Sequence, residues 1–129
     1  MRYLLFSVLV IFSIGLFAVP QAFADVTIEN AAGSSTPGCE ETDSCFIPST
    51  VTVSVGEIIT WENTDTAAHT ATAGGGAGEG PSGVWDSSLI MAGGSYSYTA
   101  DTVGTYPYFC MVHPWMLGTV IVGGSASEP

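Results

Sequence analysis

Apolar and polar residues alternate along several short segments of this chain from about residue 26 onward. The clearest case is residues 50–55, where Val51, Val53 and Val55 are separated by Thr or Ser. A period of two places alternate side chains on opposite faces of a β-strand. Similar patterns predict further strands at residues 26–29, 58–61, 95–99, 105–110 and 118–122.

No long segment repeats apolar residues with the period of an α-helix, and turn residues separate the predicted strands. Short strands with regular turns indicate an all-β sandwich or barrel. The glycine-rich residues 74–83 lack the following helix and the lysine of a phosphate-binding loop, so they predict a flexible surface loop.

The first 24 residues differ from the rest of the chain. A positive start at Arg2, an apolar run over residues 4–19 and an Ala-Phe-Ala sequence at residues 22–24 predict a secretory signal peptide. An uncleaved anchor is the alternative, because the run is slightly long for a signal peptide, although it is slightly shorter than a membrane span. We therefore expect a signal segment at 1–24, one domain at 25–122 and a flexible tail at 123–129.

Charge limits the partners of the predicted domain. Arg2 is the only Lys or Arg, against 12 Asp and Glu residues. Such an acidic surface repels nucleic-acid phosphates and anionic lipid, and it attracts a basic protein. The same charge also serves solubility, and the sequence does not decide between the two roles.

The chain has three cysteines, of which Cys39 and Cys45 flank a polar turn and are a possible disulfide pair. Cys110 is then left over. It precedes His113 by three residues, and Met116 follows by three more, in a tight loop between two predicted strands. His69, the only other histidine, lies on a distant loop. Two imidazoles, one thiolate and a weak axial thioether are the ligands of a type 1 copper ion.

Each ligand has an alternative interpretation when taken alone. An isolated Met or Cys more often packs in a core, and an isolated His is more often structural. Zinc accepts the same donors, although structural zinc sites usually recruit a second pair of thiolates. Met111 is a spare axial candidate, but it should point across the strand from Cys110. The four residues together favour copper.

At these residues the sequence resembles the cupredoxin family, especially its plastocyanin and amicyanin branch. The loop Cys110-x-x-His113-Pro114-x-Met116 is similar to the short amicyanin ligand loop, and the resemblance extends over residues 46–122. It implies a Greek-key β-sandwich with equatorial ligands His69, Cys110 and His113 and axial ligand Met116. Many members carry Asn after the first histidine, where this chain has Thr70. The hydroxyl of Thr70 can do part of the bracing that this Asn provides.

The resemblance implies a secreted, monomeric electron carrier with one copper ion and redox partner proteins, and not an enzyme. The edge of His113 is the expected electron exit, with Pro114, Trp115 and Leu117 as an apolar docking patch; Trp115 is alternatively a core aromatic. The rival functions are copper storage or delivery, an open copper site that binds a small molecule such as nitric oxide, and a metal-free adhesive domain. A copper enzyme is a further rival, but it would normally need a second copper with histidines of its own. We also expect Tyr106 or Tyr108 to pack beneath the metal.

Overall fold

The structure is a computed structural model that describes residue 15 and residues 25–124. Apart from residue 15, the predicted signal segment lies outside the described residues, as do residues 125–129 of the predicted tail. In the described part, no helix has the length and apolar character needed to cross a membrane. The prediction that the tail begins at Gly123 is wrong, because Gly123 is the last residue of a strand.

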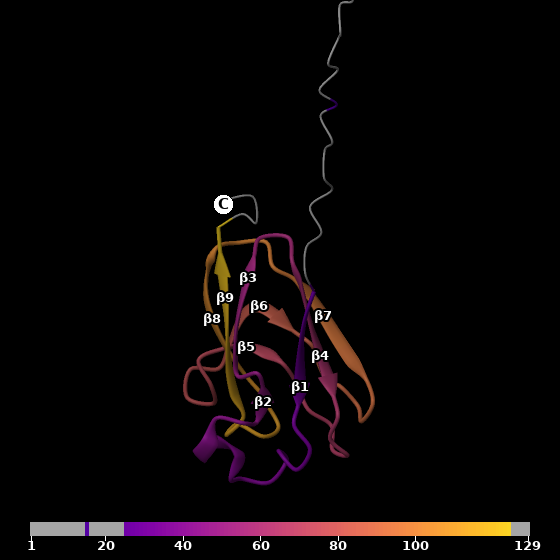
Figure 1. Ribbon diagram of the computed structural model, residues 1–129. Coiled ribbons are helices and arrows are strands. Elements are labelled where there is room, and N and C mark those ends of the chain that lie inside the picture. Colours follow the sequence, from indigo (N-terminus) through magenta and orange to yellow (C-terminus); the bar gives the residue numbers. More distant parts are fainter. Residues whose placement is uncertain (1–14, 16–24, 125–129) are drawn as a thin grey trace, which may run out of the picture.

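Two β-sheets pack face to face, which confirms the predicted all-β sandwich (Figure 1). The first sheet has four strands in the order β2-β1-β4-β7. Its strands are β1 (Val26–Asn30), β2 (Phe46–Ile47), β4 (Ile58–Asn63) and β7 (Ser95–Thr99). The pairing of β1 with β4 is parallel and the other two pairings are antiparallel.

The second sheet has five strands in the order β3-β9-β8-β5-β6. Its strands are β3 (Thr50–Ser54), β5 (Thr72–Gly74), β6 (Pro81–Asp86), β8 (Gly104–Phe109) and β9 (Leu117–Gly123). The β3–β9 pairing is parallel, and β8 lies between β9 and β5. Pro107 is tolerated in this inner strand because β5 pairs with β8 only at Tyr108 and Phe109.

The core lies between the sheets and follows the predicted alternation. In β3, Val51 and Val53 are buried while Thr50 and Thr52 are exposed. Aromatic rings fill the middle of the sandwich, where Tyr108 contacts the rings of Phe46, Trp61 and Trp85. The expectation that one tyrosine packs in the core is confirmed, since Tyr108 is buried.

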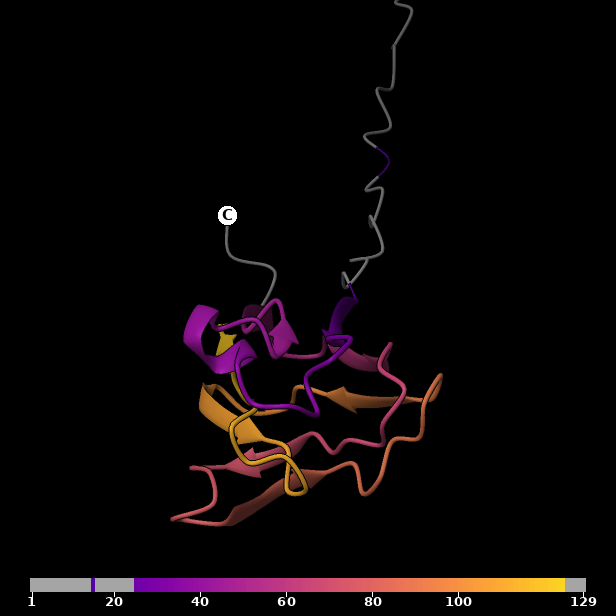
Figure 2. The ribbon, with the colours of Figure 1, turned by 90° about the horizontal axis from the view of Figure 1, so that it is seen from below.

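Four elements are additional to the predicted ones: β2, β5, β6 and a short 3-10 helix, η1 (Cys39–Thr42). The prediction of one loop over residues 74–83 is wrong at both ends, because β5 includes Gly74 and β6 begins at Pro81. Strand β4 ends and the loop between β8 and β9 begins at the lower end of the sandwich in Figure 1. Helix η1 lies at the same end, as the view from below shows (Figure 2).

Candidate metal centre

Two arms of the chain meet at this end of the sandwich. The first arm carries His69, whose backbone exchanges two hydrogen bonds with Ile90. The second arm is the loop from Cys110 to Met116. This loop is closed by hydrogen bonds from the Cys110 N–H to the Met116 carbonyl and from the Met116 N–H to the His113 carbonyl. The backbone therefore fixes both arms before any metal binds.

His69, Cys110 and His113 direct three donor atoms at one point. Cys110 Sγ lies 3.8 Å from His69 Nδ1 and 3.7 Å from His113 Nδ1, and the two nitrogens are 3.1 Å apart. The point equidistant from the three atoms lies about 2 Å from each, which is the length of a bond from a transition metal to nitrogen or sulfur. The three predicted equatorial ligands thus form a cluster of the right size for one metal ion.

A carboxylate orients the first imidazole. His69 Nε2 lies 2.7 Å from Asp65 Oδ2, and both side chains are buried. A carboxylate only accepts hydrogen bonds, so the Nε2–H of His69 donates to it. The free lone pair then lies on Nδ1, which faces Cys110.

The charge states of these groups favour metal binding. Burial raises the pKa of Asp65, but hydrogen bonds from Gly33, His69 and Thr66 outweigh it and lower the pKa to about 2. Burial lowers the pKa of His113, and the neighbouring His69 lowers it further. The Asp65 carboxylate is therefore ionised at neutral pH, and the lowered pKa of His113 favours its neutral form, which has a lone pair for a metal.

Thr70 binds both arms together. Its backbone N–H donates to Cys110 Sγ over 3.3 Å, and its hydroxyl oxygen accepts from the Met111 N–H over 2.9 Å. The expectation that this hydroxyl braces the ligand loop is confirmed. A hydrogen bond to a thiolate stabilises its charge, so this contact bears on the reduction potential of a bound metal.

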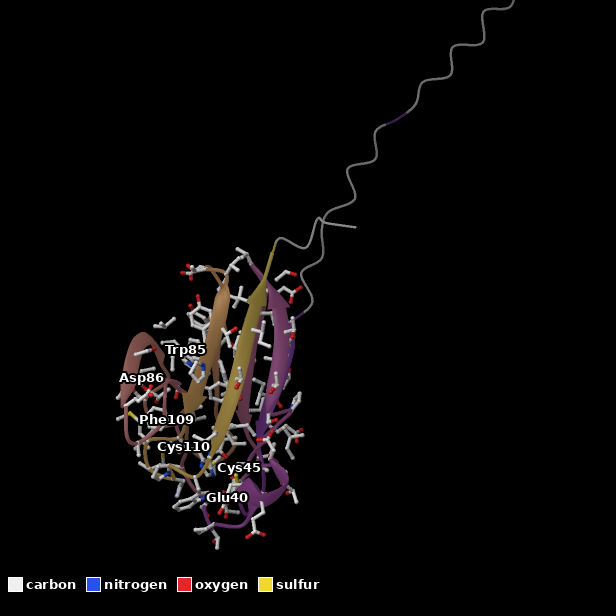
Figure 3. The ribbon with its side chains drawn as sticks, turned by 90° about the vertical axis from the view of Figure 1, so that its left-hand side faces the viewer. Glu40, Cys45, Trp85, Asp86, Phe109 and Cys110 are labelled. Carbon is white, nitrogen blue, oxygen red and sulfur yellow. A yellow bond between two sulfur atoms is a disulfide. The ribbon has the colours of Figure 1, made fainter. Side chains whose placement is uncertain are left out.

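The Thr70 hydroxyl belongs to a chain of hydrogen bonds in which the direction of each bond is fixed. Thr72 Oγ1 donates to Asp86 Oδ1 over 3.0 Å, which uses its only proton. Thr70 must then be the donor in its 2.9 Å contact with Thr72. The chain runs from the Met111 N–H through two buried hydroxyls to the Asp86 carboxylate, which is labelled with Cys110 in Figure 3.

The two methionines of the ligand loop differ in burial. Met116 is fully buried in the core beside the loop, while Met111 is 47% exposed. Trp115 is half-buried and packs against the core, and its indole N–H donates to the Ser34 carbonyl over 2.8 Å. Trp115 is therefore anchored to the molecule and is not a freely exposed docking residue.

Cys39 and Cys45 form the predicted disulfide. With Glu40 they also form a group of closely spaced donor atoms, but a disulfide has no thiolate to offer a metal. Of the described cysteines only Cys110 is free, and it is buried. The metal site is thus confined to the two arms.

Comparison with known proteins decides the family. Residues 34–123 match the family of copper-binding proteins that includes plastocyanin and azurin. The chain belongs to this family. Copper is accordingly the metal of this cupredoxin, and its soft thiolate with two imidazoles suits that ion.

Relatives of this cupredoxin include a plastocyanin and an amicyanin. Plastocyanin from Scenedesmus fuscus is 39% identical over 85 residues, which are 60% of this chain and 85% of the relative. Amicyanin-alpha from Methylorubrum extorquens is 32% identical over 77 residues, which are 56% of this chain and 59% of the relative. The chain therefore spans less than two thirds of the amicyanin-alpha length.

Solved structures support the fold. A purple cupredoxin from Nitrosopumilus maritimus superposes with a TM-score of 0.68 at 23% identity, covering 77% of this chain and all of the other. The crystal structure of amicyanin from Paracoccus versutus gives a TM-score of 0.55 at 24% identity, with 77% of this chain and 81% of the other covered. These likenesses confirm the cupredoxin fold.

The sequence placed the Trp85-Asp86-Ser87 turn near the site, as the bond from Thr72 to Asp86 bears out, but it missed three other groups: Asp65, Thr72 and the Ser34 carbonyl. Asp65 precedes His69 by four residues, a spacing that a search for a carboxylate near each histidine could have found. The Ser34 carbonyl had no signal, because every residue carries a backbone oxygen.

Proposed function

We propose that this cupredoxin is an extracytoplasmic carrier of single electrons, with one type 1 copper ion on His69, Cys110 and His113 and with Met116 as axial ligand. The observation that carries the proposal is the triangle of Nδ1, Sγ and Nδ1 atoms around one point about 2 Å from each. Bound copper would supply a one-electron couple between Cu(I) and Cu(II).

The protein's own groups are suited to that task. Asp65 holds His69 in one tautomer, and Thr70 donates to the thiolate while bracing the loop after it. Such fixed ligands need little rearrangement between the two charge states. Both histidines are used at this site, so the chain has none left for a second, catalytic copper. We therefore propose a carrier and not an enzyme.

The exit for the electron is the edge of His113, which is partly exposed. Met111 and Val112 of the same loop and Leu117 at the start of β9 are each about half exposed, with exposed fractions of 47%, 50% and 50%. A small apolar patch around a partly exposed ligand suits brief contact with a partner protein. Residues 1–24 would direct the chain out of the cytoplasm as a signal peptide.

Titration of the purified metal-free chain with Cu(II) tests the metal site. We expect one copper per chain and an intense visible absorption from thiolate to copper. Cys110→Ser should abolish the absorption, and Met116→Leu should retain it with a changed reduction potential. A colourless or redox-silent product in the unmodified chain would refute the proposal.

Electron self-exchange between Cu(I) and Cu(II) forms tests the exit without a known partner. Val112→Glu places a negative charge at the apolar patch of an already acidic molecule, so two copies should meet less often, and the exchange rate should fall at least tenfold. Val103→Glu, on a side chain that is 60% exposed in the turn before β8, is the control and should change the rate little. Equal effects of the two substitutions would exclude the patch as the exit.

A further inference from the structure

Residues 31–45 run across the metal end of the sandwich, between β1 and β2, and include the disulfide and η1. We propose that this segment is a clamp that fixes the spacing of the two ligand-bearing arms. The inference rests on the proposed copper site, because the arms are defined by its ligands. Figure 2 shows the segment beside the loop between β8 and β9.

The clamp holds the first arm through Asp65. The Gly33 N–H donates to Asp65 Oδ1 over 3.0 Å, while Oδ2 of the same carboxylate accepts from His69. Gly33 has φ +82°, a backbone conformation that a residue with a side chain rarely adopts. One carboxylate therefore connects the clamp directly to the His69 ring.

Ser34, the residue of the clamp that follows Gly33, holds the second arm. The Ser34 carbonyl accepts from the Trp115 indole N–H over 2.8 Å, and Cys45 Sγ lies 4.0 Å from the Trp115 carbonyl oxygen. Trp115 stands between His113 and Met116 in the ligand loop. Consecutive residues of the clamp thus contact opposite arms.

Hydrogen bonds and a disulfide within the clamp make it rigid, so that a displacement at one end reaches the other. The buried Ser34 hydroxyl donates to the Ala31 carbonyl over 2.6 Å, and the Ala31 N–H donates to the Cys45 carbonyl over 3.0 Å. The disulfide between Cys39 and Cys45 closes the rest of the segment. A movement of one arm is therefore resisted by the other through two peptide units.

This arrangement makes the clamp a positioning element for the metal. Thr70, the residue after His69, also connects the two arms, through its bonds to Cys110 and Met111. Holding both histidines near each other before copper arrives lowers the ordering cost of binding. We therefore expect a weakened clamp to loosen both arms together.

Hydrogen exchange in the metal-free protein tests the coupling. Ser34→Ala removes the internal hydroxyl bond and touches neither arm through its side chain. We expect the Gly33 amide and the Trp115 indole proton both to exchange about fivefold faster, the scale of one lost hydrogen bond. Ser97→Ala also loses one hydroxyl bond, to Thr60 on the outer face of β4 and β7, and should change neither proton.

Three results for Ser34→Ala would overturn the proposal: faster exchange of only one of the two protons, of neither, or of all amides equally. Cys39→Ser with Cys45→Ser is the second variant. It should accelerate the exchange of the same two protons more than the exchange of the backbone amides in the second sheet. Because no copper is present, this result is independent of the proposed function.

Copper release gives the second measurement. Transfer of copper to a chelator should be about fivefold faster from Ser34→Ala than from the unmodified chain, with a shifted thiolate absorption maximum. An unchanged rate and spectrum would show that the segment does not position the ligands. If the unmodified chain gives no thiolate absorption at all, the proposed function fails, and the exchange experiment alone decides the clamp.

Discussion

At the scale of single residues, Thr70 supports the metal site through two different groups, its backbone amide and its hydroxyl. Its amide stabilises the Cys110 sulfur, and its hydroxyl accepts the Met111 N–H that begins the ligand loop. Only the second task depends on the side chain. The substitution Thr70→Val keeps the shape and removes the hydroxyl, so it separates the two.

We predict that Thr70→Val destabilises the metal-free protein by about 1–3 kcal/mol, because the Met111 N–H loses its acceptor in a part-buried place. Thr70→Ser keeps the hydroxyl and should lose less than half as much. Urea unfolding measures both free energies, and the thiolate absorption of the copper form should shift in the Val variant. Equal stability of the Val and Ser variants would show that the hydroxyl braces nothing.

The ionised Asp65 makes the stability of the metal-free protein depend on acid pH. Its pKa is lowered from 3.8 to about 2 in the folded chain. A carboxyl with a lower pKa when folded stabilises the fold above its unfolded pKa, and this contribution disappears as the pH falls through the folded pKa. We therefore predict a loss of about 2 kcal/mol between about pH 4.5 and pH 1.5 from this group.

Asp65→Asn should remove that part of the pH dependence, as measured by urea unfolding at a series of pH values. Glu29→Gln, on an exposed position of β1, is the control and should leave the profile unchanged. An unchanged profile in the Asn variant would mean that the carboxyl is not ionised by its surroundings. The Asn variant should also bind copper more weakly. Asp65 accepts from His69 through one oxygen and from Gly33 and Thr66 through the other, whereas an amide has only one oxygen and cannot serve both sides.

The sequence predicted residues whose chemistry is rare and missed those whose chemistry is common. Cys110, His113 and His69 are the chain's only free thiol and its only imidazoles, so little competed with their assignment. Asp65 is one of 12 acidic residues, and its spacing of four residues from His69 is the one signal in the sequence that points to it. Its role depends on a turn that only the fold brings beneath the ring.

At the element scale, Gly118 decides how closely β9 approaches β8. A Cβ at this position would overlap the ring of Tyr108, which pairs with Gly118 across the two strands. That ring cannot move away easily, because it contacts Phe46 at 4.8 Å and Trp61 at 5.3 Å between ring centroids. The absent side chain of Gly118 therefore makes room for the main aromatic residue of the core.

We predict that Gly118→Ala destabilises the fold by about 1–3 kcal/mol through overpacking. Gly124→Ala, just beyond β9, meets open space and is the matched control, with a change below about 0.5 kcal/mol. Chemical denaturation measures both. A neutral Gly118→Ala would mean that Tyr108 can adopt a second position within the core.

The predicted and missed strands differ in their patterns. Strands β3, β4 and β7 alternate over five or six residues, and their positions followed from that period. Strand β5 has three residues that are all buried, so it shows no alternation. Strand β6 begins with Pro-Ser-Gly, which is typical of a turn. Their strand form comes from pairing with β8 and with each other, which is tertiary information.

At the scale of the whole molecule, acidic side chains lie at the same end of the sandwich as the candidate exit for the electron. The described residues contain no Lys or Arg, and η1 carries Glu40 and Glu41 at the metal end. Figure 3 shows Glu40 at the same end as Cys110. Glu57 and Asp101 lie in the turns at the opposite end, beyond β3 and β7. The two pairs therefore allow charge at the exit to be separated from net charge.

The rate at which small outer-sphere reagents oxidise the Cu(I) form measures the electrostatic field of these acidic residues without a partner protein. The rate with a tris(phenanthroline)cobalt(III) cation should fall as ionic strength rises from about 0.01 to about 0.1 M, where the Debye length shrinks from about 30 to about 10 Å. The rate with the hexacyanoferrate(III) anion should rise over the same range, because screening removes repulsion.

Neutralising the acidic pair of η1 should weaken both salt dependences more than neutralising the distant pair. Glu40→Gln with Glu41→Gln removes two charges at the metal end, and Glu57→Gln with Asp101→Asn removes two at the far end, so the net charge of the two variants is the same. At about 0.1 M ionic strength the distant pair is screened, since the sandwich is longer than the Debye length. If both double variants change the cation rate equally, the field acts through net charge alone. In that case the acidic surface serves solubility and does not steer a basic partner to His113.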